Sequence, residues 1–206
     1  GGGGCLGSNV VFENVLVTGN SAASGGGLFF LNTSNNESIL NNVTIVDNTA
    51  TSNGGGVYGY AVGNETIINS IIWGNSGSSP NILVSAGLSV FYSNIGGGWL
   101  GEGNINIDPN FTDPENDDYT LQWPSPCINT GNPDLDGDGE DYTTDIDDQD
   151  SDGTRMDMGA FYFDYTYYGC TDPTACNYDE TKLYDDGTCA YPEENYDCAG
   201  NCIVEI

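Results

Sequence analysis

The chain has 206 residues, of which 31 are acidic, 2 are basic and none is histidine, a length that allows one mid-sized domain and a small appendage. A formal charge of -29 excludes nucleic acid as a partner and disfavours anionic lipid, so divalent cations are the expected counter-ions. No apolar run approaches the roughly 18 residues of a membrane helix, and we expect no membrane insertion.

The negative charge is concentrated in the second half of the chain. Residues 1–100 contain four carboxylates, and residues 101–206 contain the other 27. The first half is rich in Asn, Gly, Ser and β-branched residues, which is typical of short strands and turns. This distribution argues against a disordered acidic chain and indicates a regular region followed by an acidic one. Because the chain opens on GGGGC, we interpret it as a mature or truncated piece of a longer protein.

Three segments of the first half repeat one pattern: VFENVLVTGNSA at 11–22, ILNNVTIVDNTA at 39–50 and TIINSIIWGNSG at 66–77. A glycine triplet followed by Cys5, Leu28 or Val57 accompanies each segment, with a period of 23 to 29 residues. We place Cys5 in the column of Leu28 and Val57 and expect it to be buried. The aligned columns are Asn14, Asn42 and Asn69; Asn20, Asn48 and Asn75; and Val17, Ile45 and Ile72.

This period predicts a solenoid in which each coil lays its strands on the next, about 4.8 Å away. A recurring Asn suits its turns for two reasons. Asn tolerates the left-handed backbone region, and its amide can hydrogen-bond the same amide one coil away. Glycine allows the close turns between strands. The fold class that we predict is therefore all-β, with three or four coils.

Residues 1–165 resemble two groups of proteins. The alternation of VTGN, IVDN and IWGN with GGGL and GGGV resembles the repeats of bacterial polymorphic outer-membrane adhesins. The run from residue 91 to Asp134, followed by DGTRMDMGAFYF, is similar to the C-terminal end of right-handed parallel β-helix proteins secreted by environmental bacteria. The resemblance implies a right-handed parallel β-helix with an acidic C-terminal cap, which we assign to residues 1–168, but it implies little about activity.

The tail, residues 169–206, contains five of the seven cysteines. Without His to share a zinc site, they predict a small disulfide-rich module in an oxidising compartment, hence an extracellular or cell-surface location. The tail also resembles a short Cys-containing repeat of secreted surface proteins from marine Bacteroidetes. We expect Cys170 to pair with Cys189 and Cys198 with Cys202, while the odd number leaves full pairing open. The candidates are Cys170, Cys176, Cys189, Cys198 and Cys202.

The stretch DLDGDGEDYTTD lies within an acidic loop, residues 132–153, and has the ligand spacing of a calcium loop. Asp134, Asp136 and Asp138 supply oxygens at positions 1, 3 and 5, Glu140 supplies its backbone carbonyl at 7, and Asp145 closes at 12. Hard oxygen ligands at this spacing favour Ca²⁺, with a dissociation constant of roughly 10⁻⁴ to 10⁻³ M. The alternative is a solvated acidic loop. The four later carboxylates complete this site or form a second one: Asp147, Asp148, Asp150 and Asp152.

The aromatic run FYFDYTYY, residues 161–168, has two interpretations. It could bind sugar rings or a partner, or it could be the covering strand of the cap with Phe161 and Phe163 inward. Trp73 and Trp99 bear on the same question, because two exposed tryptophans along one face would favour carbohydrate binding and burial of both would count against it.

The repeats do not predict an enzyme. They contain no Lys, Arg or His for a lyase, and their carboxylates occupy different columns, so no stacked glycosidase pair is expected. We therefore expect a non-enzymatic, calcium-stabilised structural or adhesive surface protein, or an extracellular fibre subunit. Self-association or contact with other subunits would cover the open strand edge. The alternative is a carbohydrate-binding β-helix module of a larger polysaccharide-degrading enzyme, with extracellular glycans as ligands.

Overall fold

The computed structural model describes residues 2–7, 9–31, 37–60, 63–84 and 87–201. The chain divides into two compact units, Gly1–Phe163 and Asp164–Ile206. The sequence-based boundary lies a few residues later, after Tyr168. The expected all-β fold is confirmed, because parallel strands stack in the first unit as a β-solenoid of about three turns.

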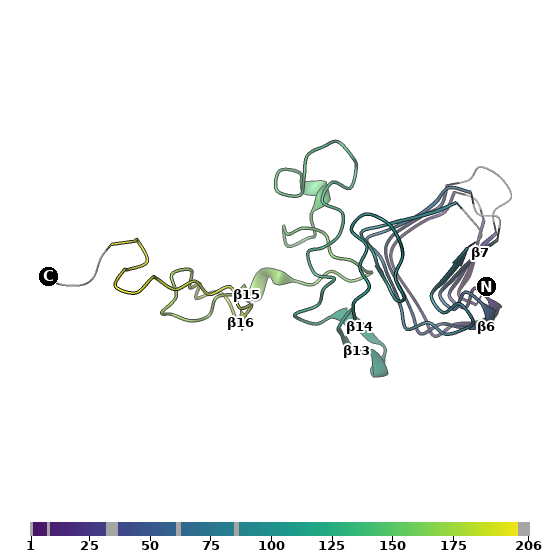
Figure 1. Ribbon diagram of the computed structural model, residues 1–206, viewed down its shortest axis with the longest axis horizontal. Helices are drawn as coiled ribbons and strands as arrows, with labels where there is room; N and C mark the ends of the chain where they lie inside the picture. The colour runs from purple at the N-terminus through teal and green to yellow at the C-terminus, as the bar shows by residue number, and fades with distance from the viewer. Residues whose placement is uncertain (1, 8, 32–36, 61–62, 85–86, 202–206) are drawn as a thin grey trace. The chain divides into compact units, whose positions relative to one another are not determined.

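Three parallel sheets form the walls of the solenoid, and Figure 1 shows its coils stacked one behind another. The first sheet contains β1 (Gly4–Leu6), β4 (Leu28–Leu31), β7 (Val57–Tyr60) and β10 (Ile82–Val84). The second contains β2 (Val11–Thr18), β5 (Ile39–Val46), β8 (Glu65–Ile68), β9 (Ile71–Trp73), β11 (Leu88–Phe91) and β12 (Asn94–Ile95). The third contains β3 (Ser21–Ser24) and β6 (Thr49–Asn53).

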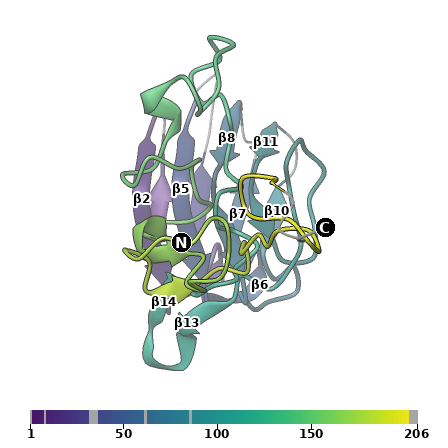
Figure 2. The same cartoon turned by 90° about the vertical axis from the view of Figure 1, so that its left-hand side faces the viewer.

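The coils stack in the register that the repeats predict. Val17 lies opposite Ile45, and Ile45 lies opposite Ile72, so equivalent apolar side chains form an inward column. Figure 2 shows β2, β5, β8 and β11 side by side in the order in which they add to the sheet. These inward residues, with Leu28, Leu40 and others, form one continuous core.

The column of Asn20, Asn48 and Asn75 is a hydrogen-bonded ladder, as predicted. The Nδ2 of Asn20 donates to Oδ1 of Asn48, and the Nδ2 of Asn48 donates to Oδ1 of Asn75, each at 3.0 Å. Asn81, which lies outside the repeat, extends the ladder by accepting from Nδ2 of Asn75 at 3.0 Å. Each of the three repeat amides also donates to a nearby backbone carbonyl, so the buried polar groups have partners.

The column of Asn14, Asn42 and Asn69 has a different role. All three residues have left-handed backbone conformations, with φ of 55°, 51° and 50°. Their amides do not form the same ladder, since Nδ2 of Asn42 donates to the carbonyl of Asp157 at 2.9 Å. The two properties expected of Asn are therefore divided between two columns, one for backbone turning and one for stacking.

The expected burial of Cys5 is wrong. Strand β1 pairs with β4 so that Gly4 lies opposite Leu28 and Cys5 lies opposite Phe29. Because successive side chains of a strand point to opposite faces, this one-residue difference turns Cys5 outward, where it is an exposed free thiol. Leu6 occupies the inward position instead and is 5% exposed.

A cap follows the last coil and returns to the second sheet. It contains a hairpin of β13 (Phe111–Asp113) and β14 (Asp118–Leu121) joined by the turn η1 (Pro114–Asn116), and a later turn η2 (Ile146–Asp148). Gly159 donates to the carbonyl of Asn69 at 2.7 Å, and Ala160 donates to Oγ1 of Thr44 at 2.9 Å. These bonds attach the end of the cap to β5 and to the turn after β8.

The second unit contains the turn η3 (Tyr165–Tyr167) and a short parallel pair, β15 (Tyr168–Gly169) and β16 (Tyr184–Asp185). The Cys170–Cys189 disulfide confirms one expected pairing. The expected Cys198–Cys202 pairing is wrong, because Cys198 is bonded to Cys176. Cys202 lies outside the described residues. These disulfides indicate a non-cytoplasmic protein.

The aromatic run at 161–168 is not one covering strand. It spans the boundary between the two units, and only its last residue lies in a strand, β15. Phe161 is 38% exposed rather than inward, whereas Phe163 is partly buried beside Trp123, with ring centroids 6.4 Å apart.

Candidate metal centre

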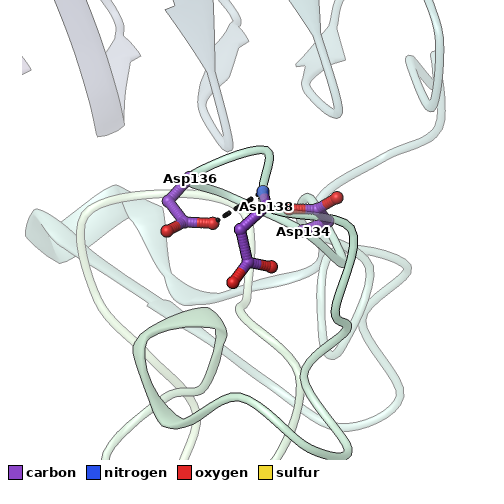
Figure 3. Close-up of side chains that lie close together, drawn as sticks. All are labelled: Asp134, Asp136 and Asp138. Atoms are coloured by element: carbon purple, nitrogen blue, oxygen red, sulfur yellow. Dashed lines mark hydrogen bonds between the residues drawn. The ribbon is translucent and has the colours of Figure 1, made fainter.

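The first three aspartates of the calcium loop converge in the structure. One carboxylate oxygen from each of Asp134, Asp136 and Asp138 lies within 4.8 Å of the other two. Figure 3 shows the three side chains on one turn of the loop. A single cation can contact three oxygens at such separations, since Ca²⁺–O distances are about 2.3 to 2.6 Å.

Backbone N–H groups hold these carboxylates in place. Gly137 donates to Oδ1 of Asp134 at 2.8 Å, and Gly139 donates to its Oδ2 at 3.1 Å. Asp138 N–H donates to Oδ1 of Asp136 at 3.0 Å. Both glycines have positive φ, 79° and 92°, a conformation that the tight turn requires and that favours Gly. Gly139 is the sixth residue of the twelve-residue stretch, the position at which a calcium loop has a glycine for its sharp turn.

Asp145 and Asp147 form a second triad with Asp136, again with one oxygen of each within 4.8 Å of the others. Asp145 is the N-cap of η2 and accepts from the N–H of Asp147 at 3.2 Å. A side-chain hydrogen bond with the Asp147 carboxylate raises the pKa of Asp145, and the negative charge of Asp147 raises it further. Asp136 thus belongs to both triads, and a cation there would relieve the repulsion.

Asp148 places a buried carboxylate next to the same loop. It is 1% exposed, and its Oδ1 accepts from the N–H of Leu135, which lies between Asp134 and Asp136. Its Oδ2 is buried and has no hydrogen-bond partner among the described residues. Burial raises the pKa of Asp148, and the charges of Asp145, Asp134 and Asp136 raise it further. An unpaired buried carboxylate oxygen is costly without a proton or a cation.

Glu140 is the remaining residue of the expected ligand set. Its N–H donates to Oδ1 of Asp138 at 2.7 Å, and its side chain is exposed. The role of its backbone carbonyl as a ligand stays a prediction. The spacing of residues 134–145 points to Asp134, Asp136, Asp138 and Asp145, whereas only the folded chain distinguishes buried Asp148 among the later aspartates.

A second acidic group lies within the cap, where the N–H of Asp157 donates to Oδ2 of Asp150 at 2.7 Å. Asp157 is 1% exposed and accepts from the N–H groups of Asn129 at 2.6 Å and Phe163 at 2.5 Å. Burial raises its pKa to about 7 despite these bonds, and Asp150 adds to the increase. Burial likewise raises the pKa of Asp150 to about 6. In the sequence, Asp157 lies in DGTRMDMGAFYF, the run that resembles the C-terminal end of secreted β-helix proteins.

A cleft of about 760 Å³ lies between the second sheet and the cap. None of its lining residues is basic, and it combines carboxylates, amides and aromatic rings. Trp73 and Trp99 do not contribute to it, and both are partly buried, with Trp99 packed against the core. The main polar and aromatic lining residues are Glu13, Asn14, Asn41, Asp150, Phe161 and Tyr162.

Comparison with protein-family models, curated proteins and solved structures finds no match for this chain. Within the described residues, no helix has the length and apolar character needed to cross a membrane. The fold and the geometry of the acidic loop are therefore the basis for a functional proposal.

Proposed function

We propose that this chain is a non-enzymatic structural or adhesive element of an extracellular surface protein or fibre, stabilised by calcium. The solenoid supplies a stiff rod, and the acidic loop of the cap binds Ca²⁺ through Asp134, Asp136, Asp138 and Asp145. The observation that carries the calcium proposal is Oδ2 of Asp148, which is buried and has no hydrogen-bond partner among the described residues, next to the charges of Asp145, Asp134 and Asp136.

The donor set favours Ca²⁺ over other cations. All the candidate ligands are oxygens, the carboxylates of the two triads and the backbone carbonyl expected at Glu140, and none is a nitrogen or sulfur that would favour zinc or copper. Two triads sharing Asp136 offer more oxygens than Mg²⁺ ordinarily takes from protein, whereas Ca²⁺ accepts six to eight in flexible geometry. Asp147 and Asp148 extend the ligand set beyond the twelve-residue loop.

A structural role accords with the character of the coils. Residues 1–100 contain no basic side chain, and their repeated residues form the core and the Asn ladder. The resemblance to bacterial adhesins, to secreted β-helix proteins and to the Cys-containing repeat of marine Bacteroidetes supports a surface location. The two disulfides agree with an oxidising environment.

A chelator tests the calcium role directly. Thermal unfolding in 10 mM CaCl₂ is compared with unfolding in EDTA, and with 10 mM MgCl₂ as the cation control. A cation bound only to the folded state at a dissociation constant of roughly 10⁻⁴ to 10⁻³ M adds about 1 to 3 kcal/mol of stability. Equal melting temperatures in calcium and in EDTA would exclude a structural calcium ion.

The cleft beside the cap favours carbohydrate binding as a second candidate function. A site with amides and carboxylates around exposed Phe161 and Tyr162 suits the hydroxyl groups and apolar ring faces of a neutral sugar. In that case the chain serves as the carbohydrate-binding module of a larger polysaccharide-degrading enzyme.

A glycan array with the intact chain tests this second function. Binding of neutral glycans that Tyr162→Ala abolishes would support it, with Tyr178→Ala as the matched control because Tyr178 is an exposed tyrosine of the second unit. Binding that is equal in both variants would place the sugar elsewhere, and no binding to any glycan would remove this candidate.

A further inference from the structure

Each coil has a glycine corner, the turn formed by the glycine triplet before β1, β4 or β7. The backbone hydrogen bonds between these corners all run in one direction along the solenoid. The N–H groups of Gly25, Gly26 and Gly27 donate to the carbonyls of Asn53, Gly54 and Gly55 in the next coil, at 3.0 to 3.1 Å. In a β-strand, consecutive N–H groups point to opposite sides. Here consecutive donors point toward the C-terminal coils, and consecutive carbonyls point toward the N-terminal ones.

The Asn ladder has the same direction. Asn20 and Asn48 each donate toward the following coil through both the backbone N–H and Nδ2, and each following Asn accepts both bonds on its Oδ1. At the N-terminal end this leaves acceptors alone. No described residue donates to Oδ1 of Asn20 or to the carbonyls of Gly2 and Gly3. Gly2 and Gly3 are exposed, whereas the equivalent Gly26 and Gly27 are buried.

Two apolar side chains of β2 are also less buried at this end than their counterparts one coil later. Phe12 and Val15 of β2 lie opposite Leu40 and Val43 of β5. Leu40 and Val43 are 0% exposed, whereas Phe12 and Val15 are only partly buried although they pack against the same core. The N-terminal face therefore combines a row of hydrogen-bond acceptors with a partly exposed apolar rim.

The other end of the same corner is closed. Gly56 donates to the carbonyl of Pro80, which has no N–H to continue the row. Asn81 ends the ladder, because its Oδ1 accepts from Asn75 and its Nδ2 donates to the carbonyl of Gly96 at 2.7 Å. A second copy stacked head-to-tail would bring Pro80, which has no N–H, and the already bonded amide of Asn81 to the acceptors of the N-terminal face. A second copy stacked head-to-head would place the carbonyls of one glycine corner opposite those of the other.

We infer that the N-terminal face binds a different β-solenoid coil in parallel register, one that presents glycine-corner N–H groups and a side-chain amide from its own C-terminal side. Such a coil supplies donors to Gly2, Gly3 and Asn20 and covers Phe12 and Val15. The inference rests on one part of the proposed function, the stiff rod, which further coils would extend. It does not depend on calcium.

A fusion of one added coil tests this inference. A second copy of residues 23–52 is placed directly before Gly1 of the full chain. In this fusion the added Asn48 precedes Gly3 by seven residues, the same spacing as between Asn20 and Gly27 in the natural coil. We expect the melting temperature of the solenoid to rise by on the order of 5 °C, since the added coil buries the open face. The control carries Asn48→Asp in the duplicated coil only, which removes the donor amide at equal size, and should lose at least half of the gain.

Three results would overturn the inference: no gain on fusion, an equal gain in the Asp control, or a dimer of the unfused chain in sedimentation that the added coil abolishes. The last result would assign the face to a second copy. All melts are repeated in EDTA, where the gain from the added coil should persist. If the calcium proposal is wrong, EDTA will leave the melting temperature of the unfused chain unchanged. That result is independent of whether the added coil raises the melting temperature.

Discussion

The coils and the acidic cap of the same unit satisfy their buried polar groups in different ways. In the coils, the amide of Asn48 finds its partners in the equivalent residues of the two neighbouring coils, Asn20 and Asn75. In the cap, buried Asp148 and Asp157 have like-charged neighbours, and burial raises the pKa of both. Repetition supplies the partners of the central ladder residue, whereas buried Asp148 of the cap depends on a proton or a cation.

The largest expected effect is the removal of a central ladder residue. Asn48→Leu should destabilise the first unit by about 3 kcal/mol, because it leaves several buried donors and acceptors without partners. Asn20→Leu at the open end should cost about 1 kcal/mol, since Asn20 is only partly buried. Urea unfolding measures both, and equal losses would contradict a cooperative ladder.

The second unit offers a contrast, since its stability should depend on covalent bonds. Cys170 and Ala175 are the buried apolar residues described there, so the disulfides take the place of a core. Replacing both Cys170 and Cys189 by Ala should cost this unit about 3 kcal/mol. Limited proteolysis should then cleave residues 164–206 while the melting temperature of the solenoid stays unchanged. A lower melting temperature of the solenoid would show that the units are coupled.

The variant Asp148→Asn should have opposite effects on the cap with calcium and without it. The substitution keeps an acceptor for the N–H of Leu135 and removes the buried charge. Without calcium it should raise the stability of the first unit, and with calcium it should weaken ion binding about tenfold, or about 1.4 kcal/mol. Calorimetric titration and melting in EDTA measure these changes.

Asp141→Asn is the matched control for that experiment, because Asp141 is exposed in the same loop and belongs to neither triad. Asp141→Asn should change neither the stability of the first unit in EDTA nor its affinity for calcium. A variant Asp148→Asn that is less stable in both calcium and EDTA would indicate a purely structural carboxylate.

The smallest expected effect is the pH dependence due to Asp157. Its pKa in the folded chain is about 7, above an unfolded value of about 3.9, so the folded state retains the proton longer. The stability from this group is complete below about pH 4 and is lost as pH rises through about 7. Between pH 6 and pH 8 the loss should be about 1.4 kcal/mol. Asp157→Asn should remove this part of the dependence, and an unchanged slope would assign it to other groups.

The repeats predict the coils because their information is local to one period. Residues one period apart become neighbours in stacked coils, so Asn20, Asn48 and Asn75 could be placed together from their spacing. The register of β1 was not predictable to one residue, since a run of glycines has no side chains that distinguish one alignment from the next. This ambiguity explains the error at Cys5.

The sequence by itself determined the solenoid, its ladder, the acidic loop and the presence of a disulfide-linked tail, since each depends on spacing along the chain. Only the tertiary structure decided that Asn81 ends the ladder, that Asp148 is buried beside the loop, and that Cys176 bonds Cys198. These features depend on where the chain returns in space after the repeats end. No periodic spacing encodes that return, because it follows from packing between segments that share no pattern.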